Sequence, residues 1–153
     1  MIARIAATLA ALWFAFPALA TIEIEEVTSP GGVAAWLVED HSIPFVALEF
    51  WFPGGSALDT PETRGATYLM MGLLEEGAAD MDAQAFAATV EGLATSFTFD
   101  ASRDVVSVGA RMLTQNRDEA ADLLRAALVE PRFDPDALER VRGQVMSLLE
   151  RNA

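Results

Sequence analysis

The order of strand-like and helix-like segments constrains the fold of this chain more than any other feature of the sequence. Three strand-like segments come first, two helical segments follow, and a hairpin then leads into two further helices. Strands grouped in this way, rather than alternating one by one with helices, favour an α+β fold over a parallel α/β fold. We therefore expect a largely antiparallel sheet with helices packed on one face.

The first three strands are indicated by apolar residues between turn signals. Residues 22–27 and 33–38 suggest two strands, and Pro30-Gly31-Gly32 between them suggests a turn. The densely apolar run from Phe45 to Phe52 predicts a third strand. Because this run has almost no polar alternation, we expect the strand to be buried on both faces.

A β-hairpin is predicted in the second half of the chain. Residues 93–99 and 106–112 each alternate between apolar and other side chains, which is typical of strands with one buried face. The polar segment 100–104 lies between them and provides the loop.

Helical segments are marked by caps and by apolar residues at helical spacing. Thr60 and Pro61 predict the start of the first helix, and Gly77 predicts its stop. Asn116, with Glu119 three residues on, resembles a capping box at the start of a later helix. The expected helices begin near residues 60, 82, 116 and 135.

The first 20 residues have the three regions of a cleavable signal peptide. Arg4 supplies a positive charge, residues 5–16 are continuously apolar, and Ala18-Leu19-Ala20 is a small-x-small cleavage pattern. The apolar region is shorter than the roughly 20 residues that a spanning helix needs. We therefore expect cleavage after Ala20, a periplasmic location, and no stable membrane insertion of the remaining domain, residues 21–153.

The charge balance argues against one class of partner. The chain has 23 acidic and 10 basic residues, a formal net charge of −13. Nucleic acids and anionic membrane surfaces both require clustered positive charge, so we expect neither as a partner. The chain has no Cys, and its stability must therefore come from packing without disulfides.

Residues that carry chemistry are scarce. A zinc-type site needs His, Cys or carboxylate groups that converge on one point, and the chain has one His and no Cys. That residue, His41, lies in a predicted turn, where exposure to solvent is the ordinary role. Glu75 and Glu76 are neighbours on a helix and point in different directions, so they are not expected to form an acid–base pair. We expect no catalytic residue, metal ligand or cofactor in this chain.

A set of short motifs, taken in order, resembles one known family. The motifs are Pro44-Phe45-Val46, Phe52-Pro53-Gly54-Gly55-Ser56, Pro61-Glu62-Thr63-Arg64-Gly65-Ala66, Gly77 and Pro131-Arg132-Phe133. This succession resembles the N-terminal domain of the pitrilysin/insulinase family of zinc metallopeptidases, which includes the mitochondrial processing peptidases. The resemblance covers nearly all of residues 21–153 and implies the α+β domain of that family. No helix-stop signal precedes Ala153, and we expect this domain to be incomplete at its C-terminus.

The resemblance also locates the positions of the family's zinc site. Active members carry His-x-x-Glu-His on the first helix, where two histidines hold zinc and the glutamate activates water. At these positions this chain has Tyr68, Met71 and Gly72. The later glutamate that completes the site falls at about Leu148, and Glu150 is two residues out of register. The resemblance thus implies the fold without the zinc chemistry.

Three functions remain open from the sequence. The chain is expected to be the exported, non-catalytic subunit of a heterodimeric zinc metallopeptidase, whose catalytic partner of the same family holds the zinc and whose substrates are unfolded peptides. Alternatively, it belongs to an active metallopeptidase whose motif lies outside residues 1–153. A third possibility is a periplasmic peptide-binding or scaffold module that needs no peptidase partner. Loss of every ligand, with the surrounding motifs retained, favours the first.

Overall fold

The computed structural model describes residues 23–151, with side chains described as far as residue 147. The predicted leader and its cleavage site after Ala20 lie outside the described residues, so export stays a prediction. No helix in the described part of the chain is long and apolar enough to cross a membrane. The chain divides into two compact units, residues 1–42 and 43–153, and each is described by itself.

The first unit contains a two-stranded antiparallel hairpin. Strands β1 (Glu25–Thr28) and β2 (Ala34–Leu37) pair with Glu26 opposite Trp36. The turn between them contains Gly32, which has a φ of 85°, a conformation that glycine adopts without steric cost. The two strands predicted in this region are therefore present.

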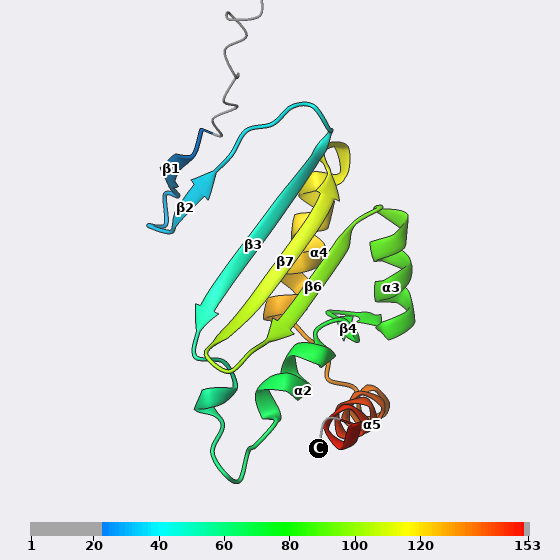
Figure 1. The fold of residues 1–153 in the computed structure, drawn as a ribbon. Coiled ribbons are helices and arrows are strands. Elements are labelled where there is room, and N and C mark those ends of the chain that lie inside the picture. Colours follow the sequence, from blue (N-terminus) through cyan, green and yellow to red (C-terminus); the bar gives the residue numbers. More distant parts are fainter. Residues whose placement is uncertain (1–22, 152–153) are drawn as a thin grey trace, which may run out of the picture. The chain divides into compact units, whose positions relative to one another are not determined.

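The second unit is built on a three-stranded antiparallel sheet of order β3–β7–β6 (Figure 1). In chain order its elements are β3 (Phe45–Pro53), η1 (Gly55–Leu58), α2 (Ala66–Leu73), β4 (Gly77–Ala78), β5 (Met81–Asp82), α3 (Ala83–Gly92), β6 (Ser96–Ala101), β7 (Val105–Leu113), η2 (Thr114–Asn116), α4 (Arg117–Val129) and α5 (Pro135–Arg151). Helix α4 lies behind the sheet in Figure 1, and none of the described helices lies in front of it. The predicted α+β architecture, with helices on one face of an antiparallel sheet, is confirmed.

The core of this unit lies between the sheet and the helices. Alternate residues of β7, namely Val108, Ala110 and Met112, are buried on the helix side, as the period of two in a strand requires. They pack in one cluster with Phe97 of β6 and Phe86 of α3. The two phenylalanine rings lie 6.3 Å apart between centroids, within the range of favourable aromatic pairs.

The prediction that the third strand is buried on both faces is wrong. Among the residues of β3, only Val46 is even half-buried, and Trp51 is 71% exposed. Strand β3 pairs with β7 along one side only and forms an edge of the described sheet. A continuous apolar run indicates that the side chains of a strand are hydrophobic. It does not indicate how many neighbouring strands or helices cover that strand.

The first predicted helix begins later than its apparent cap. Helix α2 starts at Ala66 after Gly65, whose φ is 91°, and Thr60 is hydrogen-bonded to Thr63 instead. The capping group is Asp59, which accepts hydrogen bonds from the Gly65 N–H at 2.8 Å and the Thr67 hydroxyl at 2.7 Å. These bonds, that from the Thr67 side chain first, lower the pKa of Asp59. The helix also ends before Gly77, which instead starts β4.

The other predicted helix starts gave mixed results. Asp82 caps α3 by accepting from the Ala85 N–H at 2.8 Å, and α5 begins at Pro135 as expected. Helix α4 begins directly after Asn116, but the Asn116 side chain makes no capping bond. Its amide donates to the Leu93 carbonyl at 2.8 Å, so the predicted capping box is not formed. The Asn116 side chain is bonded to a residue distant in the sequence and therefore does not cap α4.

Candidate functional site

Helix α2 carries three of the four positions at which the resemblance placed a zinc site. The helix packs against β6 and α5, and its residues 68, 71 and 72 are a tyrosine, a methionine and a glycine. Tyr68 is 44% exposed. A phenol replaces the imidazole that the family's first ligand position requires.

Met71, at the position of the catalytic glutamate, is a core residue. It is 3% exposed and belongs to the cluster that includes Leu74 of the same helix and Phe97 of β6. Its thioether is suited to filling space between hydrocarbon groups. A carboxylate in this place would be desolvated, because the surrounding cluster is apolar.

Gly72, where the resemblance places the second histidine, lies against Val141 of α5. A Cβ atom added to Gly72 would lie 2.9 Å from Cγ1 of Val141. Val141 is itself buried at 4% exposure and packs with Leu73 and Ala137. An imidazole at this position would therefore displace Val141, and the side of α2 that would hold the metal is occupied by the helix–helix contact.

The fourth position falls in α5. The backbone of Leu148 and Glu150 is helical, but both side chains lie outside the part of the chain whose side chains are described. The substitution of the later glutamate by Leu148 stays a prediction.

His41 belongs to the first unit and lies in the segment after β2. Its side chain is 89% exposed, and Nε2 is 3.8 Å from a carboxylate oxygen of Glu39. Within residues 23–151, His, Cys, Asp and Glu side chains form no group of three or more that could hold a metal ion. The residues present at the family's zinc positions, a phenol, a buried thioether and a glycine, do not fit zinc.

Glu75 and Glu76 lie in the turn after α2, which ends at Leu73, and the prediction that they are on the helix is wrong. Glu76 reaches α5, where one carboxylate oxygen lies 2.5 Å from Nη2 of Arg140. Partial burial of its carboxyl raises the pKa of Glu75, and the charges of Glu76 and Asp100 add to this effect. The two carboxyl groups therefore do not form a pair that could act on one substrate atom.

Replacing Glu75 with glutamine is expected to raise the melting temperature at neutral pH. The raised pKa means that stability from the protonated form is present below the ordinary value of 4.5 and is lost as the pH rises through the folded-state pKa. The variant should therefore exceed the wild type at neutral pH and match it below 4.5. Thermal melts across this range, with Glu76→Gln as the control, check the effect. The control loses the ion pair with Arg140 and should not gain stability.

Two of the remaining motif elements, Gly77 and Pro131-Arg132-Phe133, are joined by backbone contacts in the structure. The Arg132 N–H donates to the Gly77 carbonyl at 3.2 Å, and the Ala79 N–H donates to the Glu130 carbonyl at 2.8 Å. These bonds join β4 to the segment before α5. Gly77 has a φ of 120°, and a Cβ there would lie 2.8 Å from the Met81 carbonyl oxygen. Gly77 and the segment around Arg132 are thus held together by backbone contacts.

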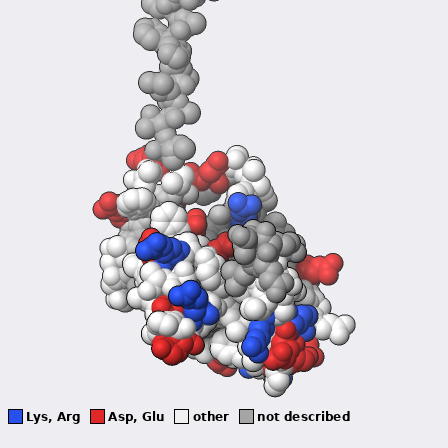
Figure 2. All heavy atoms as spheres, turned by 60° about the horizontal axis from the view of Figure 1, so that its bottom comes forward, with Lys and Arg blue, Asp and Glu red and all other residues white. Residues whose placement is uncertain are grey.

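The surface carries charges of both signs. Figure 2 shows acidic and basic side chains interspersed on the face drawn, without a continuous basic patch there. Several arginines lie beside acids, including Arg117 with Asp118 and Arg132 with Asp134, each pair 2.8 Å apart. The expectation that nucleic acid is not a partner stays a prediction.

Sequence similarity identifies the family of this chain. The model of the insulinase family, peptidase family M16, matches residues 35–152, which is well over half of the chain. The chain belongs to the insulinase family. The resemblance inferred from the ordered motifs is therefore confirmed.

Two curated relatives from this family illustrate its range. The chain is 31% identical over 111 residues to "Non-peptidase homolog YmxG" of Helicobacter pylori, covering 72% of this chain and 26% of that protein. It is 21% identical over 128 residues to "Probable mitochondrial-processing peptidase subunit beta, mitochondrial" of Arabidopsis thaliana, covering 84% and 24%. The insulinase-family chain described here spans about a quarter of the length of these relatives.

Solved structures support the same fold. A peptidase M16 inactive domain from Pseudomonas fluorescens superposes with a TM-score of 0.77 at 27% identity, covering 85% of this chain and 32% of that one. Pitrilysin superposes with a TM-score of 0.69 at 19% identity, covering 86% and 14%. Among these similarities are a non-peptidase homologue and an inactive domain, and the present chain is likewise an insulinase-family domain of the inactive type.

Sequence reasoning overlooked two polar residues that the structure brings forward. Asp59 holds the start of α2, and only its place before a Thr-Pro pair hinted at a capping role. Arg111 stands on the sheet face away from the helices, between the buried Ala110 and Met112. The alternation of the predicted hairpin was sufficient to place Arg111 on that face, but not to show what surrounds it.

Proposed function

We propose that this chain is the non-catalytic subunit of an exported heterodimeric zinc metallopeptidase and binds unfolded peptides in that complex. The observation that carries the proposal is that residues at which the resemblance places the zinc motif serve packing. Met71 is part of the core, and Gly72 gives room to Val141. The surrounding frame is intact, because Gly77 and Arg132 remain joined. A domain frame without zinc ligands fits a structural or binding role.

The printed names of the relatives support the same division of labour. One relative is named a non-peptidase homologue and another a processing-peptidase subunit. Under the proposal, a catalytic partner of the same family holds the zinc ion, and this chain contributes surface and peptide contacts. No nucleic acid takes part, in keeping with the net charge of −13.

Peptide binding is supported by the free edges of the sheet. Strands β3 and β6 are the two outer strands of the described three-stranded sheet, with β7 between them. An edge strand presents unpaired N–H and C=O groups to which an extended peptide can add as a further strand. A peptide must be extended to bind in this way. Unfolded peptides, the proposed substrates, meet this condition.

The export part of the proposal rests on the sequence. The basic, apolar and small-residue regions of the first 20 residues form a signal-peptide pattern with a cleavage site after Ala20. N-terminal sequencing of the protein from a periplasmic fraction should begin at Thr21. Recovery of the protein with Met1 intact in the cytoplasm would contradict export.

The absence of intrinsic activity is tested on the purified full-length protein alone. Incubated with unfolded reporter peptides and added zinc, it should bind peptide, retain no stoichiometric zinc and cleave nothing. A metal chelator should leave peptide binding unchanged. Zinc-dependent cleavage by the chain alone, reversed by the chelator, would show that the assignment as a non-catalytic subunit is wrong.

A further inference from the structure

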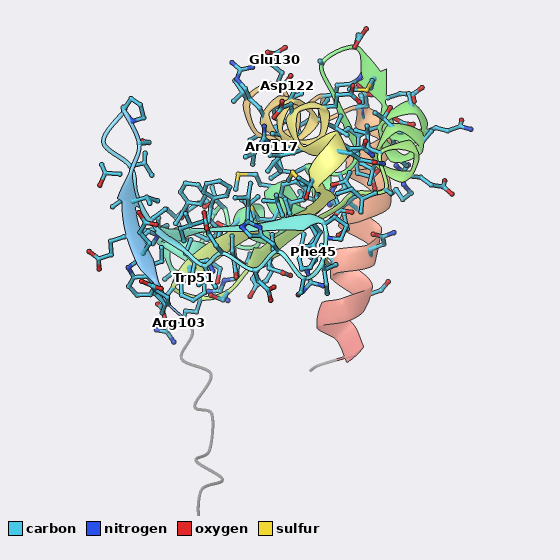
Figure 3. The ribbon with its side chains drawn as sticks, turned by 90° about the horizontal axis from the view of Figure 1, so that it is seen from above. Phe45, Trp51, Arg103, Arg117, Asp122 and Glu130 are labelled. Carbon is cyan, nitrogen blue, oxygen red and sulfur yellow. The ribbon has the colours of Figure 1, made fainter. Side chains whose placement is uncertain are left out.

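The sheet of the second unit has one face that the described helices leave uncovered. Figure 3 views the molecule from the top of Figure 1, with the sheet edge-on: α4 with Arg117, Asp122 and Glu130 lies on one side, and Phe45 and Trp51 lie on the other. We call the side opposite the buried Val108, Ala110 and Met112 the open face. It contains the alternate side chains of the three strands, because successive strand residues point to opposite faces.

A cation stands on this open face in an otherwise acidic chain. Arg111 of β7 pairs across the strands with Ala47 of β3 on one side and Ser96 of β6 on the other. It is exposed, and within the described residues no carboxylate oxygen lies within 4.0 Å of its guanidinium. Arg64 and Arg125 also lack a carboxylate within this distance among the described residues, but neither lies in a strand of the sheet.

The nearest acid on the open face is directed elsewhere. Glu49 lies one position further along β3, opposite Gly109. Its carboxylate accepts a hydrogen bond of 2.7 Å from the indole N–H of Trp51, which lies still further from Arg111 in the register. This hydrogen bond orients the Glu49 carboxylate toward Trp51 and away from Arg111. The Arg111 guanidinium is therefore available to bind a ligand.

Arg111 lies in a shallow hollow with apolar walls. The hollow measures about 620 Å³ and is lined by Phe45, Ala47, Ser96, Arg111 and Leu113, among others. A guanidinium beside apolar side chains matches a ligand that carries a carboxylate next to an apolar group.

We propose that this hollow binds the C-terminal residue of an extended peptide, with the α-carboxylate on the guanidinium of Arg111 and an apolar side chain against Phe45 and Leu113. The inference rests on the proposed peptide-binding function and names the part of the peptide that is recognised. A C-terminus combines a carboxylate and an adjacent side chain on one residue. Glu49 and Asp100 on the same face repel peptides that carry acidic side chains further along. This pattern favours one terminal carboxylate over an acidic segment.

The experiment compares two forms of one peptide. A short labelled peptide ending in leucine is prepared as the free acid and as the C-terminal amide, and each is titrated with the full-length protein by fluorescence anisotropy. The free acid should bind about tenfold or more tightly than the amide, which is the value of a charge-assisted hydrogen bond. Arg111→Gln should remove this preference. Arg125→Gln, an exposed position on α4, should keep it.

A second variant places a competing carboxylate inside the hollow. Ala47 is exposed and directly opposite Arg111 in the register, so Ala47→Glu places a carboxylate beside the guanidinium. This variant should also bind both peptide forms equally while its circular dichroism and melting curve match the wild type. It keeps Arg111 in place, so its result does not depend on how Arg111→Gln folds.

The outcomes separate this inference from the proposed function. If both peptide forms bind the wild type equally well, peptide binding stands and recognition of the C-terminus by Arg111 is overturned. If neither form binds, both this inference and the peptide-binding part of the proposed function fail. A preference for the acid that survives in both Arg111→Gln and Ala47→Glu places the carboxylate elsewhere and also overturns the inference.

Discussion

Replacing Gly55 with alanine is expected to destabilise the second unit by at least about 3 kcal/mol. Gly55 is buried, with a φ of 39°, and a Cβ there would lie 2.4 Å from the Ser102 carbonyl oxygen and 2.6 Å from that of Arg103. Both are backbone atoms of the turn between β6 and β7, which cannot rotate away as a side chain can. The substitution therefore forces the end of β3 away from the hairpin.

The contact that would be lost holds two segments together, residues 54–57 and the hairpin turn 102–104. The Gly54 N–H donates to the Asp104 carbonyl, and the Ser56 and Ala57 N–H groups donate to the carbonyls of Ser102 and Arg103, at 2.7 to 2.9 Å. Gly55 is thus the residue that allows one backbone to lie directly on another, whereas Gly54 has a φ of 134° and faces the Leu58 side chain. This close approach is the physical reason for Gly55 in the motif that links the chain to its family.

Two further glycines provide controls for Gly55→Ala in chemical denaturation. Gly65 has a φ of 91° but no atom within 4 Å of its added Cβ, so Gly65→Ala should cost only the conformational strain of about 1–2 kcal/mol. Gly143, inside α5, also has open space, and Gly143→Ala should be stabilising by up to about 1 kcal/mol. If Gly55→Ala is no worse than Gly65→Ala, steric exclusion at the hairpin is not the cause.

Restoring the glutamate of the zinc motif is expected to damage the fold and not to create a site. Met71→Glu places a carboxylate at a position that is 3% exposed within an apolar cluster, and we expect a loss of at least about 3 kcal/mol. The neighbouring Met70 is 43% exposed, so Met70→Glu should change the free energy of unfolding by no more than about 0.5 kcal/mol. Urea denaturation of both variants gives the comparison.

The same helix can be given the whole motif. Adding Tyr68→His and Gly72→His to Met71→Glu restores His-x-x-Glu-His in sequence, but the side chain at residue 72 collides with Val141 of α5. The triple variant should fail to bind zinc in equilibrium dialysis and should melt below the wild type. A folded triple variant that binds one zinc ion would mean that the site was lost by substitution alone and that packing has not closed it.

Local signals predicted the elements, and competing side-chain hydrogen bonds, both local and distant in sequence, decided their details. The alternation of residues 93–112 gave the β6–β7 hairpin, and Asp82 and Pro135 marked helix starts correctly, because each of these signals acts within one turn of the chain. Thr60 and Asn116 failed as caps because their partners, Thr63 and Leu93, compete for the side chains. Competition of this kind is not visible in the spacing of residues.

The sequence predicted which residue types occupy the candidate site. Only the packing of the helices explains why zinc does not fit there. Ordered motifs located Tyr68, Met71 and Gly72 in the sequence, but nothing local showed that Val141, about seventy residues later, would close over Gly72. Similarly, the apolar run of β3 suggested full burial because hydrophobicity was its only signal. The open face and its hollow around Arg111 depend on which strands are neighbours, namely β3 and β6 on either side of β7.

The central claim, that this chain acts as the non-catalytic half of a zinc peptidase, is tested most directly by recovery of the tagged full-length protein from its native periplasm. The eluate is analysed for co-purifying chains, zinc content and cleavage of unfolded peptides. We predict a second insulinase-family chain that carries His-x-x-Glu-His, together with zinc and chelator-sensitive activity. Recovery of this protein alone, metal-free and inactive, would contradict the account.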